Sequence, residues 1–271
     1  MFDQLILPEE QKKTMSELVL SQTETQERTR SQLGNRARSG LTVLLHGGPG
    51  TGKTFTATCI AEKNRRPLLL GFIEVGGSIA DLEQSLNQSF QLAERWGAIL
   101  LLEDVDAFLA QRRHGESSNL VATFTKAIQA IGKHSGVLFL TTCRVGVLDE
   151  AVLSRIDYTV RYEPLSHHAR QQIWRMALRD KVQGSLEQDI RIRLQDWEHL
   201  KGMEDLNGRD IQTVVLAARQ LASRQGEPLR MEAIEHVLKA RTEFANYLTK
   251  VHGLTLADHA IKNKFRLDRP G

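Results

Sequence analysis

The 271-residue sequence predicts a three-layer αβα domain with a parallel five-stranded sheet, followed by a small all-helical domain. Two observations carry this prediction. Five short apolar runs alternate with helical patterns in the first 164 residues, and strands that are apolar on both faces are typical of a parallel sheet covered by helices. After Pro164 the strand pattern stops and only helical patterns follow.

The elements of the first domain are expected in the following order. Residues 6–20 have Pro8 near the start and an apolar side, which predicts a helix, whereas the polar residues 21–40 predict a loop. Further helices are expected from Lys53 and from Ile79, and around 120–131. The strands are expected at 41–46, 67–75, 98–104, 136–143 and 158–162.

The rest of the chain shows helical patterns near 167–180, 187–196, 207–225 and 230–248. In the third of these, Asn207 is a suitable N-cap and Gly226 a suitable end. The predicted organisation is therefore an α/β domain over residues 1–164, a helical lid domain over 165–248 and a basic C-terminal tail over 249–271.

Composition excludes few classes of function. The net charge of +3, from 36 basic and 33 acidic residues, is too balanced to indicate a nucleic-acid binder. Cys59 and Cys143 form neither a zinc-like spacing nor a disulfide framework, so we expect a reducing, cytoplasmic location by default. No run of 18 apolar residues and no signal-peptide pattern occurs, and we expect neither a membrane span nor secretion.

The stretch "LLHGGPGTGKT" (44–54) fits the pattern G-x-x-x-x-G-K-[ST] and lies between a predicted strand and a predicted helix. Backbone N–H groups of such a loop can surround a phosphate chain, aided by the positive end of the following helix. In this pattern the lysine contacts the β- and γ-phosphates and the hydroxyl binds Mg²⁺. An incidental glycine turn is the alternative. The candidate nucleotide-binding residues are Gly47, Gly48, Pro49, Gly50, Thr51, Gly52, Lys53, Thr54 and Phe55.

A second apolar run, "AILLLEDVD" (98–106), ends in carboxylates. At the carboxyl edge of a parallel sheet these acids would lie beside the bound phosphates. One carboxylate would hold Mg²⁺ through water, and its neighbour would polarise the attacking water. The alternative is a run of acids that caps a helix at Asp106.

Together these residues resemble an AAA+ ATPase. "GGPGTGKT" is similar to the Walker A segment of that family and "ILLLEDVDAFL" to its Walker B segment. The stretches "FDQLILPEE", "LLLEDVDAFLAQR", "GVLFLTTCRVGVLDEAVLSRIDYTVRYEPL" and "LNGRDI" are similar in order and spacing to a fungal branch of AAA ATPases. The resemblance implies a P-loop NTPase fold with a helical lid, and Mg²⁺-dependent hydrolysis of ATP to ADP and phosphate. It also implies a ring of identical subunits, expected to be a hexamer, that remodels an unknown protein partner.

The resemblance assigns roles to several residues. In the family the first Walker B carboxylate coordinates Mg²⁺ together with the Walker A hydroxyl of Thr54, and the second is the catalytic base; these positions are Glu103 and Asp104 here. The family's usual order is Asp then Glu, so this pair is reversed. Arg155 in "LSRID" matches the arginine finger that reaches a neighbouring subunit's γ-phosphate, with a surface salt bridge as the alternative. Arg209 in "NGRDI" matches sensor 2.

Besides the reversed pair, two features depart from the family. The sensor-1 position, usually Asn, is Cys143, whose thiol is a weak donor; Thr142 could substitute, or Cys143 could simply pack. The stretch 74–83 has no aromatic residue, so the sequence gives no support for threading a polypeptide by aromatic grip.

Two other functions stay open. The reversed carboxylates and Cys143 are compatible with a nucleotide-binding scaffold that hydrolyses little or no ATP. The basic tail and the arginines of 28–38 are compatible with a nucleic-acid-associated motor, although such segments are more often solvated surface.

Overall fold

The computed structural model describes residues 2–31, 40–71, 79–109, 122, 124–126, 136–179, 190–191, 200 and 206–266. The chain divides into two compact units. The first comprises Met1–Gly47 and Gly52–Tyr162, and the second comprises Gly48–Thr51 and Glu163–Gly271.

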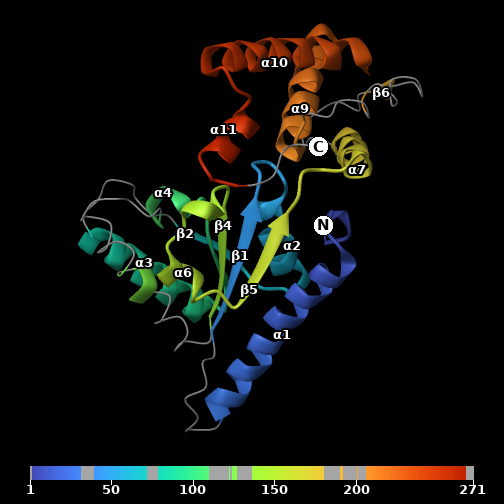
Figure 1. The fold of residues 1–271 in the computed structure, drawn as a ribbon. Helices are drawn as coiled ribbons and strands as arrows, with labels where there is room; N and C mark the ends of the chain where they lie inside the picture. Colours follow the sequence, from blue (N-terminus) through green and yellow to red (C-terminus); the bar gives the residue numbers. More distant parts are fainter. Residues whose placement is uncertain are drawn as a thin grey trace. The chain divides into compact units, whose positions relative to one another are not determined.

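The first unit is built on a parallel five-stranded sheet with the strand order β2-β3-β4-β1-β5 (Figure 1), which confirms the predicted fold class. Because the strands are parallel, the carboxyl ends of β1, β3 and β4 meet at one edge of the sheet. The strands are β1 (Leu41–Gly47), β2 (Leu68–Gly71), β3 (Ile99–Leu102), β4 (Val137–Thr142) and β5 (Tyr158–Tyr162).

Helices cover both faces of this sheet, as continuous apolar strands require. Alternate residues of β1 face opposite layers: Val43 and Leu45 pack in a cluster with helices α1 and α2, and Leu44 in a cluster with α3 and α6. Figure 1 shows these two pairs of helices on the two sides of the sheet. The unit also contains the 3₁₀ helices η1 (Phe2–Gln4) and η2 (Val145–Val147); its α-helices include α1 (Glu9–Ser31), α2 (Lys53–Lys63), α3 (Ile79–Trp96), α4 (Asp106–Leu109) and α6 (Glu150–Leu153).

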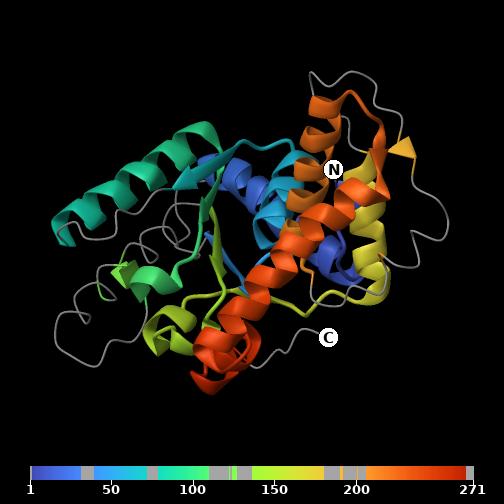
Figure 2. The same ribbon diagram turned by 90° about the horizontal axis from the view of Figure 1, so that it is seen from above.

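The second unit is a packing of helices around its own core, in which Trp174, Val214 and Ile234 are fully or almost fully buried. The elements described in it are α7 (His167–Arg179), β6 (Ile190–Arg191), α9 (Gly208–Gln225), β7 (Leu229–Arg230), α10 (Met231–His252) and α11 (Leu256–Lys262). Figure 2 shows α7 and α10 beside α9. The predicted caps of α9 are both present: the Asn207 side chain accepts from the Asp210 amide, and Gly226 ends the helix with φ +68°.

Three sequence-based expectations were wrong. Helix α1 continues to Ser31 through part of the predicted loop, because the segment up to that residue contains neither glycine nor proline to stop it. Residues 190–191 of the predicted helix 187–196 form strand β6, paired with β7, so tertiary pairing overrides local pattern there. Helix α10 ends at His252 rather than 248, and α11 was not predicted, although Thr255 caps it by accepting from the Asp258 amide.

Several expectations fall outside the described residues. They include residues 72–75 of the predicted strand 67–75, most of the predicted helix around 120–131, the arginines between 32 and 38, and residues 267–271 of the basic tail. In the part of the chain that is described, every helix is too short or too polar to cross a lipid bilayer.

Candidate active site

The glycine loop joins the end of β1 to the start of α2, so the predicted strand–loop–helix context is present. Gly47 ends β1 with φ +144°, and a Cβ atom there would lie 2.3 Å from the carbonyl oxygen of Tyr162. Gly52 stands directly before α2 with φ +102°. Only glycine fits the first position, and the second favours it strongly, because residues with a Cβ rarely adopt such backbone angles.

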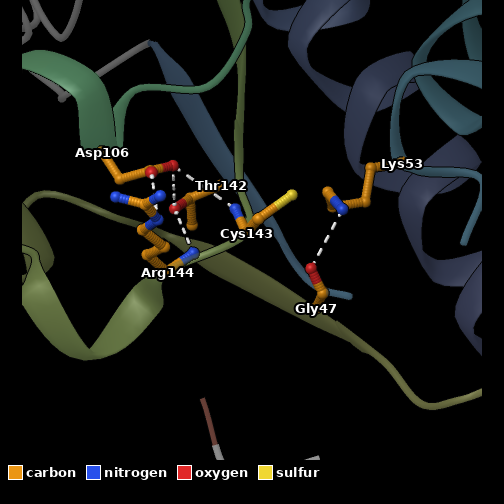
Figure 3. A network of polar contacts seen from close by, with 6 residues as sticks. All are labelled: Gly47, Lys53, Asp106, Thr142, Cys143 and Arg144. Atoms are coloured by element: carbon orange, nitrogen blue, oxygen red, sulfur yellow. Dashed lines mark hydrogen bonds and ion pairs between the residues drawn. The ribbon is translucent and has the colours of Figure 1, made fainter. Parts of the chain in front are cut away.

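Lys53 is the first residue of α2 and its side chain is held close to the loop. The residue is only 6% exposed, and its ammonium group donates to the Gly47 carbonyl over 3.0 Å (Figure 3). A lysine ammonium is a compact point charge with three donors, which suits it to phosphate oxygens. The charge therefore lies beside the carbonyl of Gly47, the first residue of the glycine motif.

Thr54 and Glu103 bring two oxygen atoms to one point. The Thr54 hydroxyl donates to the Glu103 carboxylate, although the residues are 49 positions apart in the sequence. Hydroxyl and carboxylate oxygens are ligands that Mg²⁺ accepts, and this ion keeps several waters when it binds through one or two protein groups. The residues present thus fit a magnesium ion, with Thr54 and Glu103 as its holders.

Asp104 follows Glu103 in an unusual backbone conformation. Its φ is +48°, in the left-handed region, and its amide donates to the Thr141 hydroxyl of β4 over 3.1 Å. Both acidic side chains are exposed, directly after the buried strand β3. The two carboxylates therefore lie at the carboxyl edge of the sheet, as expected from the sequence.

The end of β4 is tied to Asp106, a contact that sequence reasoning missed. The buried Thr142 hydroxyl donates to the Asp106 carboxylate over 2.6 Å, and the Cys143 amide donates to the same oxygen over 3.3 Å. Arg144 forms an ion pair with Asp106 over 3.7 Å, and its amide donates to the Thr142 hydroxyl. The Thr142 hydroxyl thus has two partners inside the protein, whereas the half-buried Cys143 thiol points away from Asp106 (Figure 3).

The structure also bears on the alternative interpretation of the acidic run. Helix α4 does begin at Asp106, so this third acid is part of a helix start. Glu103 and Asp104 precede that helix, and Glu103 contacts Thr54 instead. The sequence signal for Asp106 was its place in a run with three acids in four residues, but its partner on β4 could not be read from that run.

Arg155 lies just after α6 and is half-buried. It forms no ion pair with any residue that the structure describes, and its Nε atom is buried without a hydrogen-bond partner there. Both interpretations of Arg155, an arginine finger and a surface salt bridge, therefore stay predictions.

The remaining predicted nucleotide-binding residues are divided between the two units. Arg209, the second residue of α9, is exposed, and the amide of the preceding Gly208 donates to the Gly50 carbonyl over 2.9 Å. Thr51 closes the loop by donating its hydroxyl to the Gly48 carbonyl over 2.9 Å. Pro49 is exposed and Phe55 is half-buried.

Comparison with known proteins identifies a family that the chain resembles. The family model described as "ATPase family associated with various cellular activities (AAA)" matches residues 43–164, which include the glycine loop, the acidic pair and Arg155. The chain contains an AAA ATPase domain. The glycine loop between β1 and α2, called the P-loop below, lies within the matched residues.

Several curated proteins resemble the chain over most of its length. A protein of Methanothermobacter thermautotrophicus, named as a 26S proteasome regulatory subunit homolog, is 25% identical over 209 residues, which are 73% of this chain and 54% of that protein. The proteasome-activating nucleotidase of Archaeoglobus fulgidus is 28% identical over 223 residues, 74% of this chain and 53% of that protein. ATPase family AAA domain-containing protein 3 of Bos taurus is 28% identical over 210 residues, which are 71% of this chain and 35% of that protein. The chain therefore spans about half the length of the first two relatives.

Proposed function

We propose that this chain binds ATP with Mg²⁺ and hydrolyses it to ADP and phosphate, and that it uses the reaction to remodel a protein partner. The observation that carries the proposal is the contact between the Thr54 hydroxyl and the Glu103 carboxylate, beside the buried ammonium group of Lys53. It joins the phosphate-binding loop to the acidic end of β3 at one point.

Each residue of the site has a role in the proposed reaction. The backbone of the P-loop and the Lys53 ammonium bind the β- and γ-phosphates and reduce the repulsion of their charges. Thr54 and Glu103 hold the magnesium ion, which neutralises negative charge on the phosphate oxygens when bound. The Asp104 carboxylate orients the attacking water and accepts its proton while the bond between the γ-phosphorus and the bridging oxygen breaks.

Assembly completes the site in this proposal. Arg155 has no ion-pair partner among the described residues, and it follows α6, away from its own P-loop in the sequence. In a ring of identical subunits, expected to be a hexamer, its guanidinium group would reach the γ-phosphate bound by a neighbour. Arg209, at the start of α9, would contact the phosphates of its own subunit.

A remodelling function is supported by the names of two similar proteins, a proteasome regulatory subunit homolog and a proteasome-activating nucleotidase. The partner of this chain is a protein of unknown identity. Hydrolysis would change the position of the helical unit and so transmit work to that partner.

A nucleotide-binding scaffold is the second candidate. It is favoured by one observation: the Thr142 hydroxyl is bonded to Asp106, so the side chain left at the sensor-1 position is a thiol. A scaffold would bind ATP and be stabilised by it, yet would release no phosphate above background.

Binding and hydrolysis can be separated in one experiment. We would measure the melting temperature and the release of phosphate with ATP, with and without Mg²⁺, for the wild type and for Lys53→Ala. The proposal expects Mg²⁺-dependent turnover, and ATP-dependent stabilisation that Lys53→Ala abolishes. Stabilisation of the wild type without turnover would favour the scaffold.

A further inference from the structure

The acidic turn, defined here as Glu103–Asp106, is bonded to the end of β4 through its last three residues. The backbone ladder between β3 and β4 ends with the pair Leu102 and Leu140. Beyond it, the Asp104 amide donates to the Thr141 hydroxyl over 3.1 Å, and the Val105 amide donates to the Thr141 carbonyl over 2.9 Å. Thr141 is therefore the residue against which the turn is folded.

The turn needs such support because of the backbone of Asp104. A φ of +48° is less favourable than the right-handed region for a residue with a Cβ atom, although aspartate tolerates it better than most, so contacts that hold this conformation stabilise the turn. The Thr141 hydroxyl accepts a hydrogen bond from the amide of Asp104, the residue in the left-handed conformation. The direction of the Asp104 carboxylate thus depends on a buried hydroxyl of the adjacent strand.

Asp106 fixes the far end of the same turn. One oxygen of its carboxylate accepts from the Thr142 hydroxyl and the Cys143 amide, and the other faces Arg144 (Figure 3). Its side chain is only 11% exposed. It therefore links the acidic turn to the residues that follow β4, which include the sensor-1 position.

We propose that Thr141 and Asp106 are positioning residues, which hold the acidic turn in the geometry that aims Asp104 at the attacking water. This inference rests on the proposed hydrolysis of ATP. Among the residues that the structure describes, neither side chain hydrogen-bonds to the phosphate-binding loop, so both act on the chemical step through Asp104 rather than on the binding of ATP. A displacement of a catalytic group by about 1 Å can lower a rate ~10²-fold.

The test compares two isosteric substitutions. Thr141→Val keeps the shape and the strand preference of the side chain and removes the hydroxyl. Thr42→Val makes the same change at a buried position of β1, near its amino end and far from the acidic turn. For both variants and the wild type we would measure kcat, KM, the Kd for a fluorescent ATP analogue and the melting temperature.

The expected result is a fall in kcat of about 10-fold or more for Thr141→Val, with the Kd of the ATP analogue within about 2-fold of wild type. Thr42→Val should keep the wild-type kcat. Equal kcat values for the two variants, or a loss of ATP affinity in parallel with kcat, would overturn the positioning role. Absence of turnover in the wild type would instead overturn the proposed function, and the inference with it.

Asp106 provides a second, graded test that does not depend on the stability of Thr141→Val. Asp106→Ala removes both acceptor oxygens and should lower kcat about 10-fold or more. Asp106→Asn keeps one acceptor for the Thr142 hydroxyl and the Cys143 amide, and should restore part of that loss. Glu150→Gln, at the exposed first residue of α6, controls for the loss of a negative charge. An alanine variant as active as this control would contradict the proposal.

Discussion

Asp104 is one of three non-glycine residues with positive φ in the described chain, and this bears on the order of the acidic pair. A short polar side chain tolerates the left-handed region better than a long one, because it can bond locally to the backbone. Aspartate at this position is therefore compatible with the turn, whereas glutamate is less so. The reversed order of the pair fits the backbone in which it is held.

This argument predicts the effect of exchanging the two acids. The double variant Glu103→Asp/Asp104→Glu should lower turnover and also lower the free energy of unfolding by up to about 1 kcal/mol, because glutamate then occupies the left-handed position. Turnover and denaturant unfolding would measure both effects. Asp104→Asn, which also tolerates this conformation, should lose turnover but keep stability. An exchanged pair that is faster than the wild type would contradict the argument.

The two cysteines should differ in reactivity. Burial raises the pKa of the Cys59 thiol to about 11, and this residue is fully buried, whereas Cys143 is half-buried at the proposed sensor-1 position. At pH 7.5 a maleimide should therefore label Cys143 and leave Cys59 unmodified until the protein unfolds. Mass spectrometry of peptides would count the labels. Labelling of Cys59 in the folded protein would contradict the packing of α2 described here.

Much of the site could be predicted at the scale of single residues, because motif spacing fixes chemistry locally. Lys53, Thr54 and Glu103 were identified in this way, and the structure brings Thr54 and Glu103 together. Thr141 and Asp106 were not identified, because their contact depends on which strand lies beside β3. A pattern in a single sequence does not indicate that β4 is the strand beside β3.

At the scale of elements, the last residue of β5 supports the start of α2. The phenol of Tyr162 donates to the Thr56 hydroxyl over 2.6 Å, and Thr56 donates to the Gly52 carbonyl over 3.0 Å. Burial raises the pKa of the Tyr162 phenol above its usual value, so the group remains a donor throughout the neutral range. The relay connects strand β5 to the residue where the P-loop becomes a helix.

Tyr162→Phe should test this relay. Loss of one buried hydrogen bond is expected to lower the free energy of unfolding by about 1 kcal/mol, and to weaken the binding of ATP because Gly52 is less well held. Denaturant unfolding and nucleotide titration would measure the two effects. Tyr158→Phe, at the half-buried start of the same strand, is the matched control. If both variants behave alike, the relay does not support the loop.

The elements also show where prediction from sequence stops. All five strands were predicted, and β5 has the predicted bounds of 158–162. Continuous apolar runs mark the buried strands β1, β3 and β4, whereas Thr159 and Arg161 of β5 are exposed. The second half of α1 was missed because its polar composition lacks the apolar spacing that marks a packed helix. The pair β6 and β7 was missed because two residues per strand carry no periodicity at all.

At the scale of the whole molecule, the central question is whether one subunit completes the site of another. Arg155→Ala should lower turnover by about 10³-fold, while the Kd for ATP stays near that of the wild type, because this arginine would act only on a neighbour's γ-phosphate. The Lys53→Ala variant should no longer bind ATP in its own site, but it still carries Arg155. Mixing the two variants should therefore restore part of the turnover.

The control for this mixing experiment is a double variant. Arg155→Ala mixed with Lys53→Ala/Arg155→Ala has no subunit that could donate the arginine, and should remain inactive. Restoration in this control, or none in the first mixture, would show that Arg155 does not act between subunits.

The measurement that tests the account most directly is the rate of phosphate release from ATP with Mg²⁺, taken across protein concentration for the wild type and Asp104→Asn. The account predicts a wild-type rate per subunit that rises with concentration, since assembly completes the site, and no such rate for Asp104→Asn. A wild type that binds ATP but releases phosphate no faster than Asp104→Asn would contradict it.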